Sequence, residues 1–314
     1  MAIDKDFYNS SSAAKLGWEP SWFGAKFFDD ELVKKVQKWQ KEHGLIADGL
    51  VGPATHRRVW TDREVNISNY EPSSRVPGRK NNYIVHNGNF LPIDWDKVVL
   101  WDEEGGLTTN SGQYYDFSGK PDRQPSMFVN HWDVCLSAES CAKILGKRGI
   151  SIHFCLDNDG TIYQLLDTQH GAWHAGVRGS SHGNKKGIGI EISNAYYTKY
   201  QDWYVKHGFG ERPVQEHGHV HGRTLSPFLD FYPVQLEALK ALWKAIHLGI
   251  GIPLEYPVDS QGSVETGVHK PCFDGTFDGF CNHYNFTRGK IDCAGLDLPT
   301  LLEEVKQSLS CEDK

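Results

Sequence analysis

The sequence predicts an α/β protein, with a mixed central β-sheet flanked by helices and a small three-helix domain, residues 1–64, in front of it. Short apolar runs typical of strands alternate with helical patterns over residues 82–314, and this mixing favours an α/β domain. Two of the runs are joined by a tight turn containing Asp-Gly, which predicts an antiparallel hairpin and therefore a mixed sheet. A length of 314 residues is also typical of about two domains.

The first domain is predicted from one amphipathic helix and the turn that follows it. Leu32, Val36 and Trp39 fall on one face of a helix that an aspartate can begin and a glycine can end. After a glycine-rich turn, Pro53 stands where a further helix would begin. About 60 residues is small for an independent domain, but three short helices can bury a core. Residues 65–81 hold two prolines and three serines and are interpreted as a linker.

The larger domain, residues 82–314, shows its predicted elements in a clear order. Buried strands are expected at 82–86, 127–132, 150–156, 161–166 and 188–192. Helices are expected at 138–145, which Gly146 would end, and at 233–248, where leucines and a tryptophan share one face. The polar, glycine-rich stretch at 102–125 is expected to be a surface insertion.

Composition excludes several classes of protein. Hydrophobic residues make up 39% and charged residues 23%, which disfavours disorder and a coiled coil. The net charge of −7 disfavours a general nucleic-acid binder, and no apolar stretch reaches the roughly 18 residues that a membrane span needs. The first residues show no apolar signal-peptide core, and seven irregularly spaced cysteines are expected to be reduced thiols. We therefore expect a protein made in a cytoplasm, with no nucleic-acid partner and no stable membrane insertion.

Five residues carry candidate chemistry. His131 ends a predicted strand, whereas His283 and Asp292 lie within ten residues of each other on a glycine-containing loop that also carries a lysine. Two histidines and a carboxylate or thiolate, with a fourth position open, form a catalytic zinc arrangement, and zinc lowers the pKa of its bound water toward roughly 7. Glu191, flanked by isoleucines, could take the proton. Lys290 could stabilise the oxyanion, which suits amide hydrolysis.

Ordinary structural roles remain open for these residues and for other histidines. His131 could be a core histidine, and Glu191 could face outward from its strand. His86 also follows a strand and rivals His131 as a ligand, but the expected helix and hairpin follow His131. His153 is expected to pack near the site rather than to bind metal. The alternating histidines of residues 217–221 fit a solvated loop better than a second metal site.

Five motifs of the larger domain resemble, in chain order, the zinc-dependent N-acetylmuramoyl-L-alanine amidases of the type-2 amidase and peptidoglycan-recognition superfamily. They are a first ligand strand, a hairpin, a cleft loop, a strand with an acidic residue and a last ligand loop: Phe128–His131, His153–Gln164, Ala172–Gly176, Gly187–Glu191 and His283–Cys293. The ordered set spans residues 128–297, about half of the chain, and is specific although each motif is modest. The resemblance implies the type-2 amidase fold, zinc as cofactor, and cleavage of the amide between N-acetylmuramic acid and L-alanine in bacterial peptidoglycan.

Carried over residue by residue, the resemblance implies roles for the five candidates. His131, His283 and Asp292 would bind the zinc ion. Glu191 would be the general base, and Lys290 would polarise the scissile carbonyl.

The cleft loop and two departures from the family pattern add further expectations. Trp173 and His174 would contact the substrate. Some members place a tyrosine just before the hairpin histidine, where this chain has Ile152, so the strand glutamate is expected to serve instead. Some members use cysteine as the third ligand, and Cys293 adjoins Asp292 where the family often has proline. Either residue could therefore be the third ligand, and the Lys-x-Asp spacing favours Asp292.

The amino-terminal part resembles the three-helix type of peptidoglycan-binding domain. Leu32–Gly44 and Ala47–Thr55 carry this match, although a helical packing module fits the same periodicity. The neighbouring amidase favours binding to the cell wall. Deleting residues 1–64 should then weaken binding to cell walls and leave the cleavage of a soluble muropeptide largely intact.

Together the two resemblances predict a modular peptidoglycan amidase with the architecture of a bacteriophage endolysin. Such a protein would accumulate without a signal peptide in the host cytoplasm, reach the wall at lysis through a membrane lesion, and act as a monomer. Two alternatives stay open. One is a recognition protein that binds peptidoglycan without cutting it, and the other is a zinc endopeptidase that cuts within the stem peptide.

Overall fold

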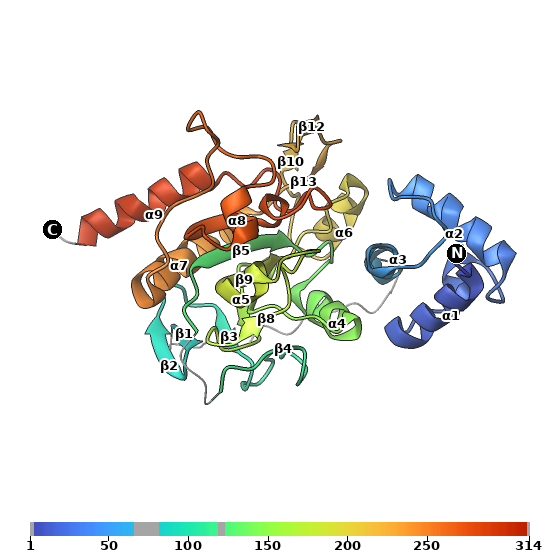
Figure 1. Cartoon of the computed structure of the whole chain (residues 1–314), viewed down its shortest axis with the longest axis horizontal. Coiled ribbons are helices and arrows are strands. Elements are labelled where there is room, and N and C mark those ends of the chain that lie inside the picture. Colours follow the sequence, from blue (N-terminus) through green and yellow to red (C-terminus); the bar gives the residue numbers. More distant parts are fainter. Residues whose placement is uncertain (1–2, 66–81, 119–122, 313–314) are drawn as a thin grey trace.

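The structure is a computed structural model that describes residues 3–65, 82–118 and 123–312 (Figure 1). A small helical part at the amino terminus, here called the N-terminal lobe, precedes a larger body built around a β-sheet. This arrangement confirms the predicted fold class. The predicted linker, residues 65–81, lies outside the described part of the chain except for Val65.

Three helices form the N-terminal lobe: α1 (Lys5–Leu16), α2 (Asp30–Glu42) and α3 (Pro53–Val65). The side chain of Asp29 accepts a hydrogen bond from the backbone N–H of Leu32 and so caps α2. Pro53 begins α3, as its position after the glycine-rich turn predicts. Buried Gln40 hydrogen-bonds the backbone of that turn. The apolar core of the lobe consists of Ala13, Leu16, Trp18, Ala25, Leu32, Val36 and Val51.

Six strands form the central sheet, in the order β14-β5-β9-β6-β7-β3. Their bounds are Val98–Leu100 (β3), Met127–Trp132 (β5), Phe154–Leu156 (β6), Ile162–Gln164 (β7), Gly187–Ile192 (β9) and Gly279–Asn282 (β14). β14, β5, β9 and β6 are parallel, whereas β6 and β7 form the predicted antiparallel hairpin. β3 and β14, of three and four residues, are not among the predicted strands.

Helices cover both faces of this sheet. α7 (Pro233–Ile250) and α9 (Leu298–Glu312) pack on one face, where Trp243 is fully buried against the strands. α4 (Ala138–Arg148) packs on the other face, in a cluster that includes Tyr163. A sheet buried on both faces explains why its strands are almost continuously apolar. None of the helices in the described residues is long and apolar enough to cross a membrane.

The remaining elements are short and surround the sheet. They are β1 (Tyr83–His86), β2 (Asn89–Pro92), β4 (Tyr114–Tyr115), β8 (Gly171–Ala172), β10 (Val214–Gln215), β11 (His219–Val220), β12 (Arg223–Thr224), β13 (Phe228–Leu229), α5 (His182–Lys186), α6 (Gln201–Lys206), α8 (Lys270–Asp274) and the 3-10 turns η1 (Pro20–Phe23), η2 (Thr198–Tyr200) and η3 (His283–Asn285). The predicted strand at 82–86 exists as β1, but it pairs with β2 outside the central sheet. The helix expected to end at Gly146 continues to Arg148. The insertion at 102–125 contains β4, which pairs with β8.

Candidate active site

Neighbouring strand ends bring the candidate residues together. β14, β5 and β9 are parallel neighbours, so their carboxyl ends lie at one edge of the sheet. His131 in β5 is the register partner of Glu191 in β9. Asn282 ends β14 opposite Asn130, and His283 therefore stands just beyond the sheet. In open α/β sheets this edge is where ligands bind.

His131, His283 and Asp292 form a compact group of possible metal ligands. The Nδ1 atoms of His131 and His283 are 2.8 Å apart. The Oδ2 atom of Asp292 lies 3.2 Å from Nδ1 of His131 and 2.9 Å from Nδ1 of His283. All three residues are buried, and within the described ranges no other cluster of at least three His, Cys, Asp or Glu could hold a metal ion.

The chemistry of these three donors fits a zinc ion. Burial lowers the pKa of His283 to about 3, so its imidazole is neutral and keeps a lone pair for a metal. Burial opposes ionisation of Asp292, but His283 and His131 outweigh it and hold the pKa of that carboxyl well below its usual range. Imidazole nitrogens and a carboxylate are zinc ligands, and a set of three leaves one position open.

The loop from His283 to Asp292 places the carboxylate of Asp292 beside the two histidines, and not the thiol of Cys293. The backbone N–H of Tyr284 donates to the carbonyl oxygen of Asp292 at 2.9 Å and closes the loop. Cys293 is fully buried in the main hydrophobic cluster. Burial also raises the pKa of its thiol well above the ordinary value, so it stays protonated. The side chain that lies beside the two histidines is that of Asp292.

Glu191 is a buried carboxyl group beside these ligands. The residue is 7% exposed, and its Oε2 atom has no hydrogen-bond partner among the described residues. Burial raises its pKa, although the charges of His131 and Arg57 act in the opposite direction. A buried acceptor without a partner is costly. Its position suits a general base that receives a proton from water or substrate.

His174 contacts His131. Its Nδ1 atom lies 2.9 Å from Nε2 of His131, so it can orient the ring whose Nδ1 faces Asp292. The backbone N–H of His174 donates to Oδ1 of Asn184 at 3.0 Å and fixes this loop. Gly189 leaves the space that the imidazole occupies, because a Cβ at that position would lie 2.5 Å from Nδ1 of His174.

Trp173 precedes His174 in the same loop and is half-buried. Its ring meets that of Tyr115 edge to face, with 5.7 Å between the ring centroids. The insertion that carries Tyr115 therefore supports the cleft loop. The indole Nε1 of Trp173 has no hydrogen-bond partner among the described residues.

Lys290 lies on the loop that ends in Asp292 and is half-buried. Burial lowers the pKa of Lys290, while the charge of Asp292 acts to raise it. Its backbone carbonyl oxygen lies 2.9 Å from Nε2 of His221. His221 thus supports the loop that carries Lys290, a role that the alternating histidines do not reveal, whereas His217 and His219 are exposed.

Two other histidines are held away from the ligand group. His153 uses both ring nitrogens, because Nδ1 accepts from the backbone N–H of Gly189 at 3.0 Å and Nε2 lies 3.0 Å from the carbonyl oxygen of His170. Nδ1 of His86 lies 2.9 Å from Oγ1 of Thr168. Neither residue belongs to the metal-ligand group, in agreement with the structural roles expected for them.

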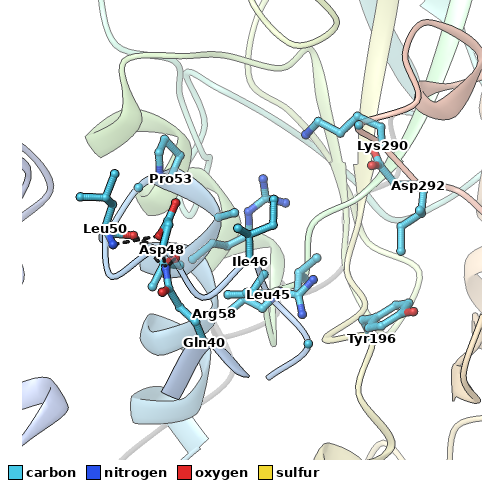
Figure 2. A pocket seen from close by; sticks show the side chains of 18 of the residues that line it. Gln40, Leu45, Ile46, Asp48, Leu50, Pro53, Arg58, Tyr196, Lys290 and Asp292 are labelled. Atoms are coloured by element: carbon cyan, nitrogen blue, oxygen red, sulfur yellow. Dashed lines mark hydrogen bonds between the residues drawn. The ribbon is translucent and has the colours of Figure 1, made fainter. Parts of the chain in front are cut away.

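A cavity of about 610 Å³ lies between the N-terminal lobe and the body. Figure 2 shows Lys290 and Asp292 on one side of it and residues of the lobe, among them Arg58, on the other. Arg57 also lines this cavity. The sequence patterns do not indicate a role in the site for either arginine, because a polar residue on a short helix ordinarily faces the solvent. The pair of adjacent arginines in the helix predicted to begin at Pro53 is the signal that the sequence offers.

Two families of known domains match the chain. Residues 121–267 match the family described as "N-acetylmuramoyl-L-alanine amidase", and residues 16–59 match the family described as "Putative peptidoglycan binding domain". The first match includes His131 and Glu191, and the second includes α2. The chain is therefore an enzyme that carries an N-acetylmuramoyl-L-alanine amidase domain together with a peptidoglycan-binding domain.

Solved structures with low sequence identity also resemble the chain. AmpDh3 from Pseudomonas aeruginosa, in complex with anhydromuramic pentapeptide, is 21% identical with a TM-score of 0.38, and the match covers 64% of this chain and 66% of that one. The endolysin amidase LysCS from Clostridium intestinale is 16% identical with a TM-score of 0.34, covering 68% and 95%. The hydrolase AmiA from Staphylococcus aureus is 11% identical with a TM-score of 0.37, covering 67% and 82%. No curated protein matches the chain.

Proposed function

We propose that this amidase is zinc-dependent and hydrolyses the amide bond between N-acetylmuramic acid and L-alanine of bacterial peptidoglycan. The observation that carries this proposal is the convergence of His131, His283 and Asp292 beside the unpartnered carboxyl oxygen of Glu191. The three ligands would hold the zinc ion. When bound, zinc supplies a Lewis acid that makes water more acidic and polarises a carbonyl group.

Glu191 carries the proton transfers. It lies on the strand next to His131 and at the same register, so its free oxygen can accept a proton from the attacking water. The oxygen of that water bonds to the amide carbon, and the bond from that carbon to the nitrogen of L-alanine breaks. Glu191 then returns the proton to the leaving nitrogen, which departs as an amine.

Lys290 and the cleft loop complete the site. Negative charge develops on the carbonyl oxygen as water attacks, and the ammonium of Lys290 can stabilise it. Trp173 and His174 are both half-buried on the cleft loop and would contact the substrate. His174 also orients His131 through the Nδ1 contact.

Metal removal tests the proposal. Protein treated with a chelator and then dialysed should release no L-alanine-terminated peptides from purified peptidoglycan, and added Zn²⁺ should restore the release. A parallel sample in which the chelator is saturated with zinc beforehand controls for damage by the chelator itself. Full activity after complete removal of metal would contradict zinc dependence.

We further propose that the protein is a monomeric phage endolysin, held in the host cytoplasm until lysis. A wall-binding domain beside an amidase suits an enzyme that must stay on the wall while it cuts. Cells that express the chain in the cytoplasm should keep their turbidity until the membrane is permeabilised, and should then lyse. Cells that express Glu191→Gln should not lyse after the same treatment. Equal clearing in both cultures would contradict this role.

A further inference from the structure

The N-terminal lobe contacts the amidase body through side chains of α3. The hydroxyl of Thr61 donates to the carbonyl oxygen of Val134 at 2.8 Å. The indole N–H of Trp60 donates to Oγ of Ser140 at 3.2 Å, and that hydroxyl donates to Glu64 at 2.7 Å. These contacts place α3 against the segment that follows β5, the strand of His131.

A second set of contacts joins α3 and the residue after α2 to the segment around Tyr200. The hydroxyl of Tyr200 donates to Oδ1 of Asp62 at 2.6 Å, and Lys199 also pairs with this carboxylate. The hydroxyl of Tyr197 donates to the carbonyl oxygen of His43 at 3.0 Å. With two separate sets of contacts, the lobe has a defined position on the body.

The cavity between these contacts reaches the active site. Lys290 and Asp292 line it from the body, whereas Arg57 and Arg58 line it from α3. In Figure 2 the side chain of Lys290 extends toward the lobe. A substrate group that enters this cavity is therefore next to the residues proposed to hold zinc and to polarise the scissile carbonyl.

The charges that face this cavity favour an anion. Arg57, Arg58, Arg223 and Lys290 supply positive charge, and the two acidic residues that line it already have partners. Asp48 accepts hydrogen bonds from the side chain of Gln40 and from a backbone N–H. Asp292 lies against the two histidines. Four positively charged residues and two negatively charged ones therefore line the cavity, which leaves an excess of positive charge.

Arg57 is the best placed of these cations. It is half-buried, and Nη1 donates to the carbonyl oxygen of Asp133, two residues after His131, at 3.2 Å. A guanidinium has five N–H donors, so most of its donors can serve a ligand. Burial lowers the pKa of Arg57, but Glu191 and Asp292 outweigh it and raise the pKa above its ordinary value.

Arg58 is more fully engaged by the protein. Its Nη1 donates to the carbonyl oxygen of His43 at 3.2 Å, and its guanidinium carbon lies 4.6 Å from the ring centroid of Tyr197. Arg58 therefore holds the lobe on the body and adds positive charge to the cavity wall.

We propose that this cavity is a substrate subsite for a carboxylate of the stem peptide, with Arg57 as its main ligand, so that the N-terminal lobe forms one wall of the active site. The inference rests on the proposed amidase function. The peptide that continues from the scissile L-alanine carries free carboxylates, and a planar guanidinium binds a carboxylate through two parallel hydrogen bonds. The lobe thus selects the peptide in addition to holding the wall.

Two forms of one substrate test this subsite. Soluble disaccharide peptides from purified peptidoglycan are used with free carboxylates, and after conversion of those carboxylates to carboxamides. The zinc-loaded full chain is compared with Arg57→Gln, Arg57→Lys and the control Arg63→Gln. Arg63 is an exposed arginine of the same helix whose guanidinium lies over Trp22, outside the cavity.

The expected result is a change in selectivity and not only in rate. The unaltered chain and Arg63→Gln should prefer the carboxylate substrate by roughly tenfold or more in kcat/KM. Arg57→Gln should lose this preference, mainly through a higher KM, and Arg57→Lys should keep part of it because the charge remains. Thermal unfolding of each variant identifies any loss of fold, and Arg57→Lys still gives a result if Arg57→Gln does not fold.

Two different outcomes would overturn the proposal. An unaltered chain that cleaves both substrates equally, or an Arg57→Gln variant that keeps the full preference, would show that the cavity does not bind the carboxylate. An unaltered chain that cleaves neither substrate would contradict the amidase function itself, and the subsite would fall with it.

Discussion

His131 and Glu191 are register partners on adjacent parallel strands, so a proposed metal ligand and a carboxyl group leave the sheet at the same level. Glu191→Gln should therefore keep zinc bound and lower kcat by roughly 10²- to 10⁴-fold, because the amide cannot accept the proton of the attacking water. Zinc content and kcat are measured on the same sample. Near-normal turnover would remove Glu191 as the base.

Substitutions at two neighbouring residues test which of them is the third zinc ligand. Asp292→Ala should lose zinc, because it removes the carboxylate that lies within 3.2 Å of both imidazoles. Cys293→Ala should retain zinc, since this thiol lies in the hydrophobic core. Metal analysis of both purified proteins checks the prediction. Loss of zinc from Cys293→Ala alone would reassign the ligand to the thiol.

The contact between His174 and His131 should tune the affinity for zinc. His174→Ala removes the ring that orients His131, and Gly189→Ala places a methyl group where that ring lies. Each substitution should weaken zinc binding by roughly 10- to 100-fold. Competition with a zinc chelator gives the affinities, and His217→Ala is the control because His217 is exposed. Unchanged affinity in both site variants would remove His174 as a positioning residue.

The stability of the N-terminal lobe should depend on pH through His56. Burial, helped by the charges of Lys147 and Arg148, lowers the pKa of His56 to about 4. In the unfolded state the His56 imidazole has a pKa of roughly 6.5. Between the two pKa values it therefore binds a proton in the unfolded state and not in the folded state. The contribution of His56 to the free energy of unfolding is therefore complete above the pKa of the unfolded state. It falls by about 3 kcal/mol as the pH drops to the pKa of the folded state.

Unfolding of the full chain at pH 7.5 and pH 5 measures this effect. His56→Gln cannot be protonated in either state, so its free energy of unfolding should fall less between the two pH values than that of the unaltered chain. Equal losses in the two proteins would show that His56 does not cause the dependence.

The sequence predicts the elements that carry the proposed catalytic residues because the patterns that indicate those elements are local. The apolar run that ends in His131, the turn at Asp159-Gly160 and the run around Glu191 each show their structure over a few residues. Parallel pairing then brings the strand ends together, which places His131 beside Glu191 in the structure.

Features that depend on tertiary contacts are not visible in the sequence. β1 has a good strand pattern, yet nothing local shows that it pairs with β2 outside the central sheet. The position of Arg57 depends on how α3 packs against the segment after β5. For the same reason the sequence suggests a separable wall-binding domain, whereas the structure shows that this domain and the amidase share a cavity.

Mass spectrometry of the products from purified peptidoglycan, digested by the zinc-loaded protein, identifies the bond that the protein cleaves. Cleavage between N-acetylmuramic acid and L-alanine should give free stem peptides that begin with L-alanine, together with glycan strands that lack peptides. New amines at positions within the stem peptide would show an endopeptidase and contradict the proposed amidase activity. A digest without products would favour a protein that binds peptidoglycan without cutting it, or a wall chemistry that this enzyme does not accept.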